Sequence, residues 1–268
     1  MRITIITVTY QAAAVLQRTL DSVSRQTCQD IEHLIIDGAS KDDTVKMAKA
    51  YQEKVPYPVI IQSEPDHGLY DAMNKGLHKA TGDYLVFLNA GDTLHADDTL
   101  STVNSQLIPE PCSPTRSLST LNSQLSTPNS PAVIYGDTAI IDSEGKFLHL
   151  RRLRPPKQLT WRSFKQGMLV CHQAFYVRTD IAQQEDYDLQ YRHSADVDWC
   201  IRVMKRAEEM RLPLVNTNTI LADFMEGGNT TQNHRVSLKE RYQVMCHHYG
   251  KASTIVMHAW FLVRQLFR

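Results

Sequence analysis

The chain has 268 residues, of which 42% are hydrophobic and 22% charged, and its formal net charge is zero. This length supports one large globular domain or two small ones. The balanced charge argues against a general nucleic-acid-binding protein, which needs a basic surplus to meet phosphates.

The cysteines and the chain ends indicate a cytoplasmic protein. The five cysteines are scattered, without zinc-finger or Cys-x-x-Cys spacing, which favours a reducing environment. Met1-Arg2 leads directly into a strand pattern, so no signal peptide is expected. The apolar run at residues 255–263 is too short to cross a bilayer.

The first hundred residues alternate between strand and helix patterns. Strands are predicted at residues 3–9, 34–37, 59–62 and 84–88, with amphipathic helix patterns between them. This alternation predicts βαβ units and a parallel sheet.

The stretch at residues 64–92 combines a helix, a buried strand and a polar ending. The helix is predicted from apolar residues that recur at i, i+3, i+4 and i+7, namely Leu69, Ala72, Met73, Gly76, Leu77 and Ala80. The polar tetrapeptide Asn89-Ala90-Gly91-Asp92 follows the strand at 84–88. Ligands of open α/β sheets bind outside the carboxyl ends of the strands, so chemistry is expected here.

The second half begins after a change in composition. Residues 109–131 are rich in Ser, Thr, Pro and Asn and are predicted to be a low-complexity surface insertion. Order resumes with a strand at 132–137, a hairpin turn at 142–145, a helix from about Ala195 and one or two strands at 213–224. The chain ends in a helical tail.

Polar residues also follow the other strands, at Thr9-Tyr10, Asp37 and Asp137. Parallel strands would bring these ends to one edge of the sheet, where a nucleotide cleft can form. The chain has no Gly-x-Gly-x-x-Gly after the first strand, no P-loop and no Gly-x-Ser-x-Gly elbow. A nucleotide diphosphate would therefore have to be held by a metal and a few carboxylates.

The motifs together resemble a glycosyltransferase of family 2 with the GT-A fold. The matching segments are ITIITVTYQ, LIIDGASKDDT, EPDHGLYDAMNKGLHKATGDYLVFLNAGD, VIYGD, CHQAFYVR and SADVDWCIRV. They cover the chain apart from the insertion and the tail. The resemblance implies an α/β fold, with a mostly parallel sheet flanked by helices. It also implies inverting transfer of a hexosyl or acetylhexosaminyl group from a nucleoside-diphosphate sugar, with UDP expected, to a hydroxyl of a glycan or lipid-linked acceptor, in surface polysaccharide synthesis.

The same resemblance assigns donor-site residues. Tyr10, next to Thr9, would lie against the nucleotide base, and Asp37 near the base or ribose. Many relatives carry two adjacent Asp residues here, whereas this chain has Gly38 after Asp37. The helix that lines the donor site would contribute Asp71, Asn74 and Lys75, with Lys75 as a phosphate contact.

The resemblance also predicts a divalent-metal site. Asn89 to Asp92 occupies the place of the family's Asp-x-Asp motif, in a subgroup with an Asn-x-Gly-Asp ending, and only Asp92 is charged. One carboxylate and the donor phosphates can hold Mg²⁺ or Mn²⁺, since Mg²⁺ takes one or two carboxylates and keeps waters. The ion would neutralise charge on the leaving nucleoside diphosphate.

Asp196 matches the catalytic base of the family, which takes the proton of the acceptor hydroxyl. The alternative is an acidic residue in the first turn of a helix, where the macrodipole stabilises it. His172 and Asp198 are predicted as acceptor contacts or supports of the site, although His172 also suits a core histidine.

The predicted division places a GT-A domain at residues 1–235 and a helical tail at 236–268. Within the domain, residues 1–100 form the nucleotide-binding half and 132–235 the acceptor and catalytic half. The tail carries an apolar stripe with basic ends, so it either closes the core or contacts the inner face of the membrane peripherally.

Two other functions stay open from the sequence. A sugar-1-phosphate nucleotidyltransferase would need a glycine-rich basic loop after the first strand, which Tyr10-Gln11-Ala12-Ala13 does not supply. A nucleotide-sugar-binding protein without transfer activity is favoured by the lost motif carboxylates, and the presence of both Asp92 and Asp196 argues against it.

Overall fold

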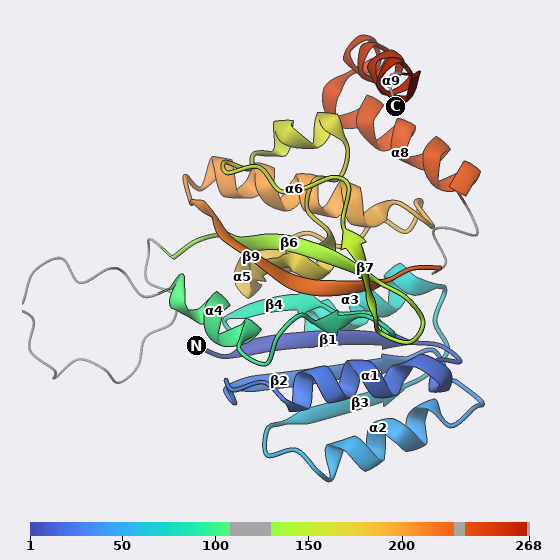
Figure 1. Cartoon of the computed structure of the whole chain (residues 1–268), viewed down its shortest axis with the longest axis vertical. Helices are drawn as coiled ribbons and strands as arrows, with labels where there is room; N and C mark the ends of the chain where they lie inside the picture. The colour runs from blue at the N-terminus through green and yellow to red at the C-terminus, as the bar shows by residue number, and fades with distance from the viewer. Residues whose placement is uncertain (108–129, 228–233, 267–268) are drawn as a thin grey trace, which may run out of the picture.

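The computed structural model describes residues 1–107, 130–227 and 234–266, and it shows one mixed sheet with helices on both faces (Figure 1). The strand order is β3-β2-β1-β4-β8-β6-β9-β5, and β7 pairs with β6 beside this path. The predicted α/β class is confirmed. Most of the predicted insertion lies outside the described residues, but its last two residues do not: Ser130 is buried, and the Pro131 carbonyl accepts a hydrogen bond from Tyr84.

The first half of the sheet is parallel, as the alternating pattern predicts. Strand β2 begins three residues earlier than predicted, at Ile31, because its polar residues are buried with partners. Glu32 accepts a hydrogen bond of 2.6 Å from the Thr4 hydroxyl, and the His33 ring lies 2.9 Å from the Thr7 hydroxyl. The elements of this half are β1 (Ile3–Thr9), α1 (Ala13–Ser24), β2 (Ile31–Asp37), α2 (Thr44–Gln52), β3 (Val59–Ser63), α3 (Leu69–Lys79) and β4 (Tyr84–Phe87).

The second half of the sheet is mixed. Strand β8 is antiparallel to both β4 and β6, while β6 and β9 are parallel. The predicted hairpin at 142–145 is confirmed, since β7 returns antiparallel to β6. The elements are β5 (Thr93–Leu94), α4 (Thr99–Ser105), β6 (Val133–Ile141), β7 (Phe147–Leu150), η1 (Trp161–Gln166), η2 (His172–Ala174), β8 (Phe175–Arg178), α5 (Thr179–Ala182), α6 (Ala195–Glu209) and β9 (Leu214–Met225).

An aromatic stack joins α3 to α6 across one face of the sheet. The ring of Tyr187 lies between those of Tyr70 and Trp199, with centroid distances of 5.4 and 4.9 Å. Phe87 of β4 meets Tyr187 and Trp199 edge-on. All four side chains are buried. This packing fixes the first turn of α6, where Asp196 lies, against the start of α3.

The tail consists of two helices, α8 (His234–Tyr249) and α9 (Lys251–Leu266), separated by Gly250 with a φ of +80°. Helix α8 lies along α6, with Val244 and Met245 buried (Figure 1). Helix α9 exposes Ile255, Val256 and Trp260. The core alternative therefore describes α8, and the membrane alternative applies only to α9. Among the described residues, no helix is both long and apolar enough to span a bilayer.

Candidate active site

The predicted residues at the ends of β1 and β2 form a hydrogen-bonded scaffold. The buried carboxylate of Asp37 accepts hydrogen bonds from the hydroxyls of Thr9, Ser40 and Ser63 at 2.6–2.9 Å, and from the Ser40 amide. Burial alone would raise the pKa of Asp37, but the hydrogen bonds from Ser40 and Ser63 outweigh it and the pKa lies below its ordinary value. Thr9 and Asp37 thus hold the ends of β1, β2 and β3 together through internal hydrogen bonds.

Tyr10 is open to solvent beside this scaffold, with 68% of its surface exposed. A Cβ atom on Gly38 would lie 2.4 Å from Oδ2 of Asp66 and 3.2 Å from the Tyr10 ring. Asp66 therefore occupies the space that a side chain at position 38 would need. Sequence reasoning missed Asp66, whose carboxylate lies where the second acidic residue of the family would be expected.

The three predicted residues of α3 have polar partners within the same chain. The side-chain amide of Asn74 donates to the Tyr187 carbonyl at 2.9 Å and accepts from the Tyr187 backbone amide at 2.7 Å. Both of its polar groups therefore hold the 185–188 loop and are not directed at a sugar donor. Asp71 accepts the His67 amide at 2.9 Å. Lys75 lies 3.1 Å from Glu64 and 3.5 Å from Asp71, so two carboxylates share its charge.

Asp92 joins the motif loop to two distant elements. Its Oδ2 accepts a hydrogen bond from Nε2 of Gln173 at 2.6 Å, and its Oδ1 accepts the amide of Met225, the last residue of β9, at 3.0 Å. Only 4% of Asp92 is exposed. Burial raises its pKa to about 6 against the effect of these hydrogen bonds.

These contacts do not fit the predicted metal site. Both oxygens of the predicted ligand already have partners, and the carboxylate is enclosed. The described residues contain no group of three or more His, Cys, Asp or Glu side chains that could hold a metal ion.

The structure does bring Asn89, His172 and Asp196 together. Nδ2 of Asn89 lies 3.2 Å from Nε2 of His172, and Nδ1 of His172 lies 3.5 Å from Oδ2 of Asp196. The hydroxyl of Tyr70, which the sequence did not single out, donates to Oδ1 of Asp196 at 3.2 Å. Oδ1 of Asn89 is buried without a partner among the described residues, so it can accept a hydrogen bond from a ligand.

This arrangement keeps Asp196 ionised. Burial by itself would raise the pKa of Asp196, but the nearby ring of His172 and the charge of Arg241 lower it below the ordinary value. The side chain stays 18% exposed at the start of α6. A partly exposed carboxylate with fixed orientation can accept a proton from a bound hydroxyl.

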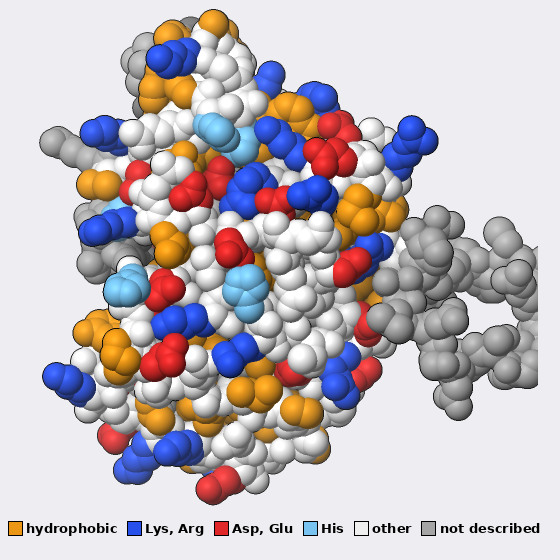
Figure 2. Space-filling view, turned by 180° about the vertical axis from the view of Figure 1, so that it is seen from behind, with side chains coloured by type: hydrophobic (Ala, Val, Ile, Leu, Met, Phe, Trp, Pro, Cys, Tyr) orange, Lys and Arg blue, Asp and Glu red, His pale blue; other side chains and the backbone are white. Residues whose placement is uncertain are grey.

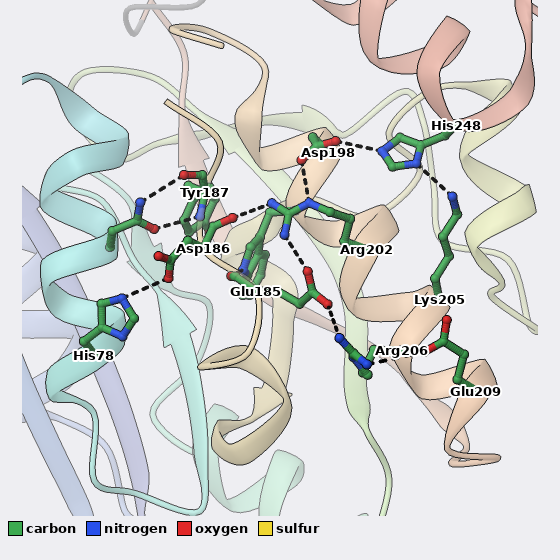
Figure 3. A network of polar contacts seen from close by, with 12 residues as sticks. His78, Glu185, Asp186, Tyr187, Asp198, Arg202, Lys205, Arg206, Glu209 and His248 are labelled. Carbon is green, nitrogen blue, oxygen red and sulfur yellow. Dashed lines mark hydrogen bonds and ion pairs between the residues drawn. The ribbon is translucent and has the colours of Figure 1, made fainter. Parts of the chain in front are cut away.

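Asp198 has its polar atoms directed to Arg202 and His248, which agrees with the predicted role as a support of the site rather than as an acceptor contact. It bonds the guanidinium of Arg202 and the ring of His248, both at 2.7 Å, and it is buried (Figure 3). His248 belongs to α8 and also meets Lys205, while Arg202 reaches Glu185. Asp198 therefore ties α8 and the 185–188 loop to α6. A surface cavity of about 460 Å³ lies along this loop and His78.

The fold places the chain in the GT-A class of glycosyltransferases. The chain belongs to glycosyl transferase family 2, whose family model matches residues 4–111. A "PGL/p-HBAD biosynthesis glycosyltransferase" of Mycobacterium bovis is 36% identical over 203 residues, which are 74% of this chain and 68% of that protein. This membership decides against a nucleotidyltransferase and against a binding protein without transfer activity.

Two solved structures support the fold. Staphylococcus aureus TarS 1-349 in complex with UDP aligns with a TM-score of 0.65 and 13% identity, covering 100% of this chain and 72% of that one. The mannosyltransferase PcManGT of Pyrobaculum calidifontis, in complex with GDP-Man and Mn²⁺, aligns with a TM-score of 0.59 and 13% identity, covering 97% and 75%. At this identity the likeness establishes the GT-A fold alone.

Proposed function

We propose that the chain is an inverting glycosyltransferase in which Asp196 is the general base. The observation that carries the proposal is the partly exposed carboxylate of Asp196 in the first turn of α6, which accepts a hydrogen bond from Tyr70 and lies 3.5 Å from the ring of His172. In this proposal residues 1–100 bind the donor and residues 132–235 bind the acceptor and supply the base.

The chemistry follows from one proton acceptor. The acceptor hydroxyl attacks the anomeric carbon from the face opposite the leaving group, and its proton passes to Asp196 as the new C–O bond forms. The bond from the anomeric carbon to the β-phosphate oxygen breaks, and its electron pair leaves with the nucleoside diphosphate. Tyr70 orients the carboxylate of Asp196, and Asn89 contacts the ring of His172 beside it.

The donor is proposed to be a UDP-sugar and the acceptor a hydroxyl of a glycan or lipid-linked molecule. The complexes of TarS with UDP and UDP-GlcNAc and of PcManGT with GDP-Man support a nucleotide-sugar donor. The TarS complexes favour uridine as its nucleoside, whereas PcManGT holds a guanosine nucleotide. The name of the Mycobacterium bovis relative, which refers to PGL/p-HBAD biosynthesis, supports a glycolipid acceptor. Dependence on Mg²⁺ or Mn²⁺, and a role of the Asn-x-Gly-Asp ending in it, stay predictions.

Replacing Asp196 tests the proposal directly. Asp196→Asn keeps the size and the Tyr70 contact but removes the base, so transfer should slow by about 10²–10⁴ while nucleotide binding stays close to wild type. The assay is transfer from a radiolabelled UDP-sugar, with UDP affinity measured on the same preparations. Asp180→Asn is a matched control, because Asp180 pairs with Arg178 away from the cluster. Normal turnover by Asp196→Asn would refute the assignment.

We also propose that α9 rests on the membrane surface that carries a lipid-linked acceptor. Its exposed residues Ile255, Val256 and Trp260 lie at the projecting end of the molecule, where Figure 2 shows hydrophobic side chains beside Lys and Arg. Apolar residues with Trp suit the lipid interface, and nearby basic residues add about 1 kcal/mol each at an anionic surface.

Flotation with liposomes tests this contact. Full-length protein should float with anionic vesicles at low salt and be released at high salt, whereas a chain that ends at Gly250 should stay in the soluble fraction. The triple change of Ile255, Val256 and Trp260 to Ser is the matched point variant. Equal flotation of both full-length forms would overturn the role of the apolar face.

A further inference from the structure

Arg241 lies on the face of α8 that meets the start of α6. Ser237, one turn before it, accepts a hydrogen bond from the Ser194 hydroxyl at 3.1 Å through its carbonyl oxygen. His248, two turns after it, bonds Asp198 at 2.7 Å. Residues at i, i+4 and i+11 share one face of a helix, so Arg241 points toward the same turn of α6, between these two contacts. Asp196 is in that turn.

Nε of Arg241 is buried and has no hydrogen-bond partner among the described residues. No ion pair joins Arg241 to a carboxylate of that part of the chain. The adjacent Glu240 accepts the amides of Arg192 and His193 at 3.0 and 2.7 Å instead. A buried donor without a partner is rare in native structures and calls for an explanation such as a bound ligand.

The electrostatic setting identifies the ligand as an anion. The helix face shared with Ser237 and His248 directs Arg241 toward the turn of α6 that contains Asp196, and its charge lowers the pKa of Asp196. The predicted metal ligand Asp92 is enclosed by Gln173 and Met225, and the charge of Lys75 is shared by two carboxylates. Arg241 is thus a cation near Asp196 with free hydrogen-bonding capacity.

We propose that Arg241 binds the diphosphate of the donor and stabilises the charge that it gains as it leaves. The inference rests on the proposed function. When the bond from the anomeric carbon to the β-phosphate oxygen breaks, the electron pair stays on that oxygen, and a fixed guanidinium beside it lowers the energy of the transition state. The planar guanidinium also suits two parallel hydrogen bonds to phosphate oxygens.

The test compares a nucleotide with its nucleoside. Binding of UDP and of uridine is measured by calorimetry with a chelator present, for wild type, Arg241→Gln, Arg241→Lys and Lys239→Gln. Lys239 is the matched control, because it loses one positive charge from an exposed position of the same helix. Unfolding temperatures of all four proteins verify that they fold.

The expected result is a loss of about tenfold or more in UDP affinity for Arg241→Gln, the usual cost of losing a hydrogen bond to a charged group, with uridine affinity unchanged. The UDP affinity of Arg241→Lys should lie between those of wild type and Arg241→Gln, and that of Lys239→Gln should match wild type. The conservative Lys variant keeps the test open if Arg241→Gln does not fold.

Three results would overturn the inference. If Arg241→Gln and Arg241→Lys bind UDP as wild type does, Arg241 is not a diphosphate contact. If Arg241→Gln shifts only the pH profile of transfer, it acts on Asp196 as a positioning residue. If wild type binds neither UDP nor GDP, in the presence of Mn²⁺ as well as with the chelator, the proposed function fails together with this inference.

Discussion

The buried carboxylate of Asp92 should make folding stability depend on pH in a way that one substitution removes. Its pKa is about 6 in the folded chain, whereas an unfolded Asp has an ordinary value of 3.8. The folded state therefore binds a proton more tightly than the unfolded state, and the contribution of Asp92 to stability rises as the pH falls from 7 toward 4. The sign is opposite to that of an ion-paired carboxylate.

The magnitude follows from the two pKa values. The full difference corresponds to about 3 kcal/mol, and the part that is expressed between pH 7 and pH 5 is about 1 kcal/mol. Asp92→Asn removes the titration but keeps a similar shape, because the amide oxygen can still accept from the Met225 amide and Gln173 can rotate its own amide. Asp92→Ala leaves both donors unpaired, at about 1–3 kcal/mol each.

Urea unfolding at pH 5 and pH 7, followed by the fluorescence of the buried Trp199, measures the difference. Wild type should gain about 1 kcal/mol more than Asp92→Asn on going from pH 7 to pH 5. All other titratable groups are the same in both proteins, so the comparison isolates residue 92. An equal gain in both proteins would show that Asp92 is not desolvated. A loss of manganese-dependent UDP affinity in Asp92→Asn, without a change in stability, would restore the predicted metal ligand.

Three further predictions concern residues outside the Asp196 cluster. Asn74→Ala should lower the free energy of unfolding by about 1–3 kcal/mol, because the backbone of Tyr187 loses both partners, and should leave UDP affinity unchanged in calorimetry. Gly38→Asp should weaken UDP binding measured in the same way, because a Cβ atom there meets Asp66 at 2.4 Å beside Tyr10, the predicted contact of the nucleotide base; unchanged affinity would show that Asp66 does not contribute to nucleotide binding. Deletion of residues 110–128 should leave the unfolding temperature and transfer rate close to wild type, because their composition cannot bury enough apolar surface to offset ordering, and a large fall in either would show that the segment packs on the domain.

Much of the fold was predictable from local patterns. Strand β1 has its predicted bounds, and α3 lies within one residue of its predicted range, because burial on one or both faces leaves a periodic trace in the sequence. The start of β2 was missed because Glu32 and His33 are polar, and their hydroxyl partners on β1 are 26 and 28 positions away. Composition identified the low-complexity segment but placed its end two residues too late, inside the core at Ser130.

The candidate site, too, was predictable only in part. By itself the sequence determined the family, the α/β order of elements and Asp196 as the expected base, because each depends on residue types at short, ordered spacings. Only the tertiary structure decided which polar atoms remain available to a ligand. Asn74, Asp92 and Asp198 match donor, metal and acceptor positions in the motifs, yet their partners lie 113, 81 and 50 residues away and occupy their polar atoms. Nε of Arg241, in the tail, is buried without a partner among the described residues. Motif spacing records the type of a side chain, whereas its hydrogen-bonding capacity depends on segments that folding brings beside it.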